Sequence, residues 1–324
     1  MPGSHYFNTP EGARVDQEIP LATDAGTVTI VNYDLWHRQM PNHTEHNRYM
    51  VKFLFARMSE PQAPSWNNQQ SFWPGAPAAL EGDGEELQKM YEQIWHWHCG
   101  RSMPPATNGH AMEELLMALA AGQERAGMAA AYDLAAYGEH SVVPLLERLA
   151  DESETTRHLA ACALSVIGAP AVGPLSKSLE DKNPVVRALA AEILGDIGLA
   201  AEAALPNLVR AAGDADEQVR FRVVEALGTV CQSAATAVPA LIECLADEDK
   251  SVRRETTFAL ARLGLRAGDA VEALEGVLED EERYVRGNAL HALGRIGTAE
   301  AKDVLIRHLI PARWCPLTSA KRTF

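Results

Sequence analysis

The chain has 324 residues, of which 47% are hydrophobic and only 6% are aromatic. It carries 29 Lys and Arg against 44 Asp and Glu, and this net charge of −15 argues against a general nucleic-acid-binding role, because phosphate contacts need a basic patch. No apolar run approaches the roughly 18 residues of a membrane-spanning helix and no signal peptide is recognisable, so we expect a cytoplasmic protein without membrane contact.

Residues 1–58 are predicted to form a β segment. The runs at 27–31 and 48–55 are rich in β-branched and aromatic residues, which is typical of strands. His37 lies in the polar, turn-prone stretch between the two runs, and Arg48 begins the second run. An imidazole can bind iron, and a guanidinium can hold a carboxylate through two parallel hydrogen bonds. The pair is therefore chemically suggestive.

The same segment resembles the C-terminal part of a phytanoyl-CoA dioxygenase-like jelly roll, that is, an incomplete double-stranded β-helix. The matching features are the Pro-Gly-Ser-His run at 2–5, the Gly-Thr-Val run at 26–28, His37, and Arg48 eleven residues after His37. The resemblance implies that His37 is the second histidine of an iron-binding facial triad. It also implies that Arg48 binds the far carboxylate of 2-oxoglutarate.

Two departures from that family bear on activity. Arg38 and Gln39 stand where the family commonly has a Gly-Ser pair, and the His-x-Asp or His-x-Glu motif that completes the iron site would have to lie before Pro2. Fe(II) and 2-oxoglutarate are therefore expected only in a complete protein, and we expect no turnover from this chain alone. The chain is then either the C-terminal portion of a longer oxygenase or a remnant that has lost catalysis. A third interpretation leaves His37 and Arg48 as ordinary surface residues.

Residues 59–110 are predicted to form an ordered connecting segment with one helix. Proline is frequent at its start, and it holds four of the six tryptophans: Trp66, Trp73, Trp95 and Trp97. The apolar spacing predicts an amphipathic helix over residues 85–98. His96 and His98 lie two positions apart and so point to different sides of this helix, which favours an interdomain packing helix over a metal site.

Residues 111–310 are predicted to form a mainly α solenoid of about six repeats. Arginines recur 30 to 33 residues apart, with an aspartate six residues before each one. The arginines are Arg157, Arg187, Arg220, Arg253 and Arg286, and the aspartates are Asp151, Asp181, Asp214, Asp247 and Asp280. Each unit has the pattern of two amphipathic helices, the second starting near a proline such as Pro206 or Pro239. Neither helix could bury its apolar stripe alone, so neighbouring units are expected to stack.

The periodic arginines and aspartates are expected to be structural. We expect each arginine to pair with an aspartate of its own or a neighbouring unit, in a ladder that sets the stacking. The aspartate is also expected to lie at the start of the following helix and accept its free N–H groups. The alternative is that the arginines form a binding stripe. Cys162, Cys231 and Cys244 fall within the helical pattern and are expected to be core residues.

The repeat resembles the HEAT family, in particular the short subtype also seen in phycobilisome lyases. Residues 186–198 and 285–297 both begin with Val-Arg and end with Leu-Gly-x-Ile-Gly. The resemblance implies a right-handed α-α superhelix. The chain lacks the His-Glu pairs of the di-iron deoxyhypusine hydroxylases, which resemble the same solenoid.

A protein partner is expected on the concave surface, which we place on the second helix of each repeat. Residues 125–310 hold 19 Lys and Arg against 29 Asp and Glu, so a basic partner is one candidate. Residues 311–324 are expected to be a capping tail, with Trp314 covering the last repeat. Three functions stay open: part of an oxygenase with a protein-binding solenoid, a non-catalytic scaffold, and, more remotely, a chromophore lyase or chaperone.

Overall fold

The computed structural model describes residues 61–64, 73, 75, 84–101, 110–231 and 234–309. Those residues contain helices and no strand, and none of their helices is long and apolar enough to cross a membrane. The predicted β segment at 1–58 and the predicted capping tail at 311–324 lie outside the described residues.

The contacts divide the chain into two compact units. The first comprises the described residues up to Tyr137 together with Glu152–Leu159, and the second comprises Gly138–Asp151 together with the residues from Ala160 onward. Helix α6 (Glu154–Ile167) therefore contributes to both units.

The first unit is built around α4 (Glu124–Ala135), which is contacted by α2 (Gly84–His98) and by α3 (Met112–Ala120). Helix α2 confirms the amphipathic helix predicted over 85–98, since Leu87, Met90 and Tyr91 on one side of it are buried. Lys89 of α2 forms an ion pair with Asp133 of α4. This ion pair and the buried apolar side chains hold the two helices together.

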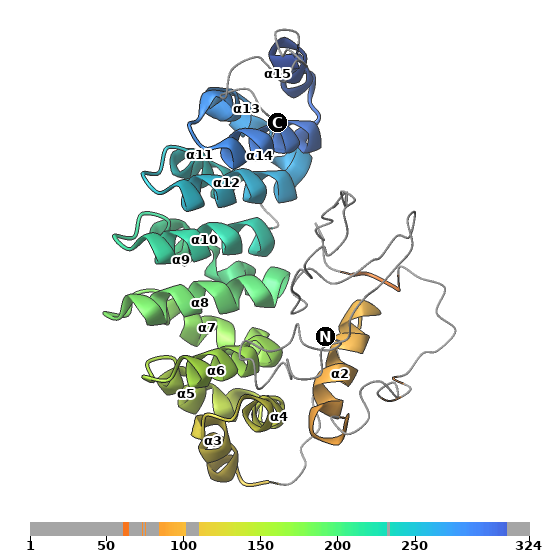
Figure 1. Cartoon of the computed structure of the whole chain (residues 1–324), viewed down its shortest axis with the longest axis vertical. Coiled ribbons are helices and arrows are strands. Elements are labelled where there is room, and N and C mark those ends of the chain that lie inside the picture. The colour runs from red at the N-terminus through yellow and green to blue at the C-terminus, as the bar shows by residue number, and fades with distance from the viewer. Residues whose placement is uncertain are drawn as a thin grey trace, which may run out of the picture. The chain divides into compact units, whose positions relative to one another are not determined.

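The second unit alternates first helices and second helices along the chain, as Figure 1 shows for α7 to α12. Its first helices, besides α6, are α8 (Pro184–Ile197), α10 (Glu217–Val230), α12 (Lys250–Leu263) and α14 (Arg283–Ile296). Its second helices are α5 (Glu139–Arg148), α7 (Ala169–Ser178), α9 (Leu205–Ala211), α11 (Ala234–Cys244), α13 (Val271–Gly276) and α15 (Ala299–Leu309). Short 3-10 helices precede α9 (η4, Gly198–Ala204) and α13 (η5, Gly264–Ala270), and η6 (Val277–Glu279) follows α13.

Leucines at equivalent positions form the core of this unit. Every one of the following is completely buried: Leu164, Leu194, Leu227, Leu260 and Leu293 from the first helices, and Leu175, Leu208, Leu241 and Leu274 from the second. Burying a leucine contributes about 2 kcal/mol relative to leaving it exposed. The predicted stack of helical repeats is therefore confirmed in the described residues.

The first helices begin at acidic or amide N-caps, but these are not the aspartates that the sequence analysis assigned. Asp216 accepts the backbone N–H groups of Gln218 and Val219, and Asp249 accepts those of Ser251 and Val252 in the same way. The periodic aspartates, such as Asp214, lie two residues earlier, in the loop. The assignment was wrong because the loops at 214–216 and 247–249 each hold an aspartate at both ends, and only the second aspartate is adjacent to the helix start.

Consecutive first helices contact one another far more extensively than consecutive second helices do. Small residues permit this approach: a Cβ on Gly195 would lie 3.2 Å from the Cα of Ala226, and a Cβ on Gly228 would lie 3.0 Å from the Cα of Ala259. The first helices therefore form the more closely packed of the two layers.

Candidate functional site

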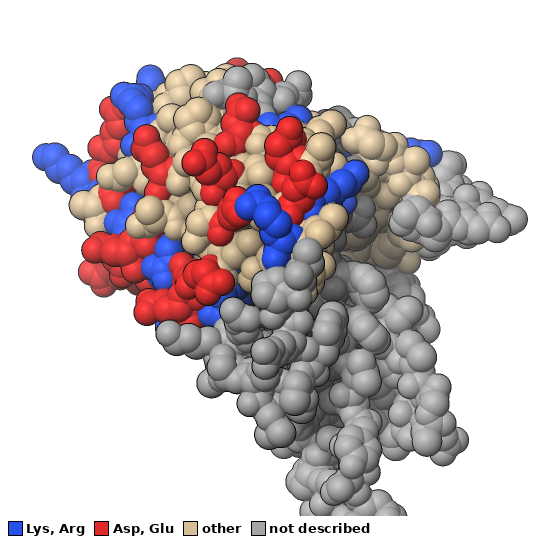
Figure 2. All heavy atoms as spheres, turned by 90° about the horizontal axis from the view of Figure 1, so that it is seen from above, with Lys and Arg blue, Asp and Glu red and all other residues tan. Residues whose placement is uncertain are grey.

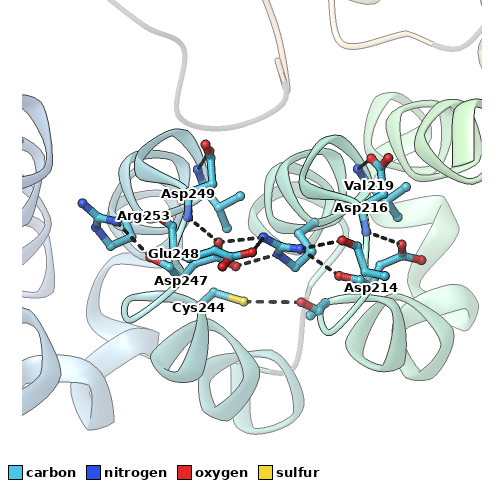
Figure 3. Close-up of polar contacts among 12 residues, drawn as sticks. Asp214, Asp216, Val219, Cys244, Asp247, Glu248, Asp249 and Arg253 are labelled. Atoms are coloured by element: carbon cyan, nitrogen blue, oxygen red, sulfur yellow. Dashed lines mark hydrogen bonds and ion pairs between the residues drawn. The ribbon is translucent and has the colours of Figure 1, made fainter.

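Three of the five periodic arginines bind aspartates of the following repeat. Arg220 donates from Nε to Asp247 Oδ2 at 2.7 Å and from Nη2 to Asp247 Oδ1 at 3.0 Å, and Figure 3 shows the contacts around Asp214 and Asp247. Arg187 holds Asp214 in the same way at 2.7 and 2.8 Å, and Arg253 holds Asp280 at 2.8 and 3.2 Å. We call this series of two-pronged ion pairs the Arg–Asp ladder.

The remaining guanidinium nitrogen of each ladder arginine, Nη1, donates to backbone carbonyl groups in the loop that precedes the arginine's own helix. Arg220 Nη1 donates to the carbonyl oxygens of Asp214 at 2.9 Å and Ala215 at 3.3 Å. The aspartate is held from a second side as well, because the backbone N–H of Asp249 donates to Asp247 Oδ1 at 2.8 Å. Each ladder step thus joins two consecutive loops, and Arg220 and Arg253 are both buried. The predicted ladder is confirmed for these three arginines, which are committed to the stack and do not form a binding stripe.

Electrostatics favour the charged forms within the ladder. Burial alone would raise the pKa of Asp214, but hydrogen bonds from Arg187 and from the Asp216 N–H bring that pKa below its ordinary value. The hydrogen bond to Asp214 likewise raises the pKa of Arg187. Both partners therefore stay ionised at neutral pH.

A second set of side chains lies on the opposite side of each first helix from the core. These residues stand two, five and nine positions after the ladder arginine, which places them on one helix face. We call this surface the first-helix face. From α8 to α14 it consists of Leu189, Glu192, Asp196, Arg222, Glu225, Thr229, Glu255, Phe258, Arg262, Asn288, His291 and Arg295.

Charged groups on the first-helix face interact across repeats. Arg222 of α10 contacts Glu192 of α8 at 3.3 Å and Glu225 of its own helix at 2.9 Å. Ser165 of α6 donates a hydrogen bond to Asp196 of α8 at 3.2 Å. The Arg262 guanidinium lies 4.8 Å from the ring centre of Phe258. The face therefore combines charges of both signs with an aromatic ring.

Two carboxyl groups on this face have raised pKa values. Asp196 is exposed, but the protein atoms packed around its carboxyl reduce its hydration, and this, with the nearby Glu192 charge adding to it, raises its pKa to about 6. Burial and the charge of Glu225 also raise the pKa of Glu255. The described residues contain no group of three or more His, Cys, Asp and Glu side chains placed to hold a metal ion. The face thus presents charged groups of both signs and one aromatic ring.

An open groove of about 630 Å³ lies on the second-helix layer, between α13 and α15. Its lining includes Asp269, Glu272, Asp303 and the ion pair of Arg307 with Glu275 at 2.9 Å. Figure 2 shows that acidic side chains gather over much of the described surface seen from this end, with Lys and Arg between them. The groove shares the acidic character of that surface.

The structure describes some of the other residues that were singled out in the sequence, namely the histidines of α2 and the cysteines of the repeats. His37 and Arg48 lie outside the described residues, so the iron and 2-oxoglutarate assignments stay predictions. His96 is buried with Glu92 at 3.9 Å, whereas His98 is only half-buried. Cys231 and Cys244 are buried as predicted, and burial raises the pKa of the Cys244 thiol to about 11. Cys162 is half-buried.

The first-helix face was not predicted from the sequence. The partner surface expected on the second helices stays a prediction. A signal was available in the repeats themselves. The ladder arginine, the alanines and the leucine recur from unit to unit, whereas the residue two positions after the arginine changes from Leu189 to Arg222, Glu255 and Asn288.

Comparison with solved structures shows likeness to helical repeat proteins. A Kap121p mutant is 17% identical over 61% of this chain and 26% of its own, with a TM-score of 0.50. The E. coli protein YibA is 23% identical over 63% of this chain and 77% of its own, with a TM-score of 0.46. The complex of CpcE and CpcF of phycocyanin lyase from Nostoc sp. PCC7120 gives 25% identity over 46% of this chain and 97% of that one, with a TM-score of 0.38.

No curated protein matches the chain. The likeness to Kap121p supports the fold alone. The family model of HEAT repeats matches residues 172–260 and 238–312, which are the segments that contain the Arg–Asp ladder. The part of the chain from residue 172 to residue 312 therefore consists of HEAT repeats.

Proposed function

We propose that the solenoid is a protein-binding scaffold and that its partner lies on the first-helix face. The observation that carries this proposal is the contrast between recurring and changing positions. Residues that the stack needs are the same in each repeat, whereas the first-helix face changes its charge and shape from one helix to the next. The stack itself does not require these changes, so they are available for recognition of one particular surface.

The packing of the layers supports the same face. In a curved stack the more closely packed layer lies on the inside, so the first helices are inferred to line the concave side. This differs from the expectation that the second helices line it. A concave surface can contact a partner through several repeats at once, which favours a protein partner over a small ligand.

The charges on the face indicate the chemistry of the partner. On α8 and α10 the acidic residues Glu192, Asp196 and Glu225 accompany a single arginine, Arg222. On α12 and α14 the balance reverses, with Arg262 and Arg295 against Glu255. We infer a partner whose basic part lies over α8 and α10 and whose acidic part lies over α12 and α14.

Charge reversal with a matched control tests this proposal. The full chain is used to capture its partner from its native source, and Asp196→Lys with Glu225→Lys is compared with wild type. The control, Glu243→Lys with Glu272→Lys, makes the same net change on exposed second-helix positions. We expect the partner to be lost only in the first-helix variant. Equal capture by both variants, or loss only in the control, would contradict the proposed surface.

The oxygenase prediction for residues 1–58 is a second candidate, supported by the Pro-Gly-Ser-His run and the spacing of His37 and Arg48. Peptide mass spectrometry of the native protein, compared with the upstream DNA, tests it. Peptides that precede Met1 and include His-x-Asp would support an oxygenase with a scaffold. A native start at Met1 would leave the scaffold alone. The chromophore-lyase alternative rests on repeat subtype and would be tested by a chromophore attachment assay.

A further inference from the structure

The last ladder arginine has the same pose as the others but lacks the aspartate. Arg286 Nη1 donates to the carbonyl oxygens of Asp280 at 2.6 Å and Glu281 at 3.1 Å, just as Arg220 does in its own loop. In the three preceding steps, Nε and Nη2 hold a carboxylate 27 residues further along the chain. Among the described residues, no carboxylate binds the Nε and Nη2 side of Arg286.

The same end of the solenoid exposes apolar positions that interior repeats cover. Leu309 is 44% exposed, whereas its counterparts Leu245 and Leu278 are 3% and 4% exposed. Leu305 is half-buried, although Leu241 and Leu274 at the same position are completely buried.

The first helix of the last repeat shows the same difference. A Cβ on Gly294 would meet nothing within 4 Å, whereas the equivalent Gly228 is closed off by Ala259. The arginine fork, the glycine and the two leucines are the groups through which an interior repeat contacts the next one. All four are open in the last repeat.

We propose that this end of the solenoid, formed by α14 and α15, docks a helical repeat supplied by another protein chain. An aspartate in the turn before one of the partner's helices enters the open fork of Arg286. The partner's apolar stripe covers Leu305, Leu309 and the surface beside Gly294. This surface is separate from the first-helix face and adds a second contact to the scaffold.

The sequence of residues 310–324 does not continue the ladder, which favours an external occupant over this segment. The ladder spacing of 27 residues leads from Arg286 to Arg313, where the preceding steps have aspartate. Residues 310–324 contain no Asp or Glu, so none of their side chains can supply a carboxylate to the fork.

A direct binding measurement tests the proposal. The probe is a dye-labelled synthetic peptide with the sequence of residues 246–263, which carries Asp247, the Asp249 cap and the apolar stripe of a first helix. Fluorescence anisotropy follows its binding to the full chain. We expect Arg286→Ala to weaken binding about tenfold, because charge-assisted hydrogen bonds to the carboxylate are lost. Arg286→Lys is also expected to weaken it, because lysine cannot provide the two-pronged fork.

The controls separate the fork from other effects. A peptide with Asp247→Asn should bind wild type about tenfold more weakly and should lose little more against Arg286→Ala. Arg283→Ala removes an exposed arginine of the same helix and should leave binding unchanged. A cooperative unfolding transition, with a midpoint lowered by no more than a loss of about 1 kcal/mol implies, shows that the Arg286→Ala or Arg286→Lys variant is folded.

Three results would overturn the proposal. One is the absence of binding to the full chain up to about 1 mM peptide. Another is equal binding by wild type and both Arg286 variants. The third is binding that appears only in Trp314→Ala, which would assign the tail as the cover of this end.

Discussion

The two layers of the second unit are built by different means. First helices approach one another through Gly195, Gly228 and the alanines that face them, and the Arg–Asp ladder fixes their loops. Second helices contact each other less and contribute mainly leucines to the core. The first-helix layer therefore sets the spacing of the repeats. We expect substitutions in this layer to lower the free energy of unfolding more than substitutions in the second-helix layer. The last repeat provides a control for the first-helix layer. Its Arg286 and Gly294 correspond to Arg220 and Gly228, but among the described residues no further repeat packs against them.

The largest effect is expected from breaking an interior ladder step. Arg220→Ala would leave the Asp247 carboxylate in a mostly buried position without its cation, which we expect to lower the free energy of unfolding by about 3 kcal/mol. Arg286→Ala loses only loop hydrogen bonds and should cost about 1 kcal/mol. Denaturant unfolding of the full chain measures both. Equal losses would show that the ladder pairs do not stabilise the stack.

Substituting glycine by alanine in the first-helix layer should change the free energy of unfolding in opposite directions in an interior repeat and in the last repeat. Gly228→Ala places a Cβ 3.0 Å from backbone and Cβ atoms of Ala259, which are on a rigid helix and cannot yield. We expect a net loss of about 1 kcal/mol, because overpacking exceeds the gain in helix propensity. Gly294→Ala meets no neighbour and should gain about 0.5 kcal/mol. Thermal unfolding would refute the close packing if both changes were stabilising.

The helix caps should contribute less to the free energy of unfolding than the Arg–Asp ladder does. Asp216→Ala removes the acceptor for two backbone N–H groups of α10, at 2.9 and 3.1 Å, and should cost about 1 kcal/mol. Asp216→Asn keeps a capping oxygen and should be nearly neutral. Circular dichroism during denaturation would follow the helices directly. If Asp216→Asn lost as much stability as Asp216→Ala, the charge of Asp216, and not its capping hydrogen bonds, would account for the stabilisation.

The smallest effect concerns the pH dependence of Asp196. Its pKa in the folded protein is about 6, above the ordinary 3.8, so ionisation of this carboxyl opposes folding. The penalty is absent below pH 3.8, grows as the pH rises towards 6, and is complete above 6. Because Asp196 keeps contact with water, Asp196→Asn should gain only about 0.5 kcal/mol at neutral pH.

Unfolding measured near pH 7.5 and again near pH 3.5 tests this sign. The gain from Asp196→Asn should vanish at the lower pH. A gain of the same size at both pH values would mean that shape, and not ionisation, accounts for the change. A loss at neutral pH would contradict the raised pKa.

Part of the fold could be predicted from sequence because it is periodic. The spacing of Arg187, Arg220 and Arg253 with their aspartates predicted both the repeats and the ladder, since pairing at a fixed register leaves a regular pattern. The cap was misplaced because Asp214 and Asp216 have the same chemistry, and only backbone geometry distinguishes them. The first-helix face was not predicted, because the packing of the layers depends on contacts between repeats, such as those of Gly228, which the spacing of residues in the sequence does not express.

Carboxyl footprinting of the scaffold with its captured partner tests whether the partner binds the first-helix face. A carbodiimide reagent labels accessible Asp and Glu side chains, and mass spectrometry reads the extent of labelling with and without the partner. We expect Glu225 and Glu255 on the first-helix face to be protected in the complex, while Glu243 and Glu272 on the second helices are labelled as before. Protection of Glu243 and Glu272, with Glu225 and Glu255 unchanged, would contradict it and place the partner on the second-helix layer.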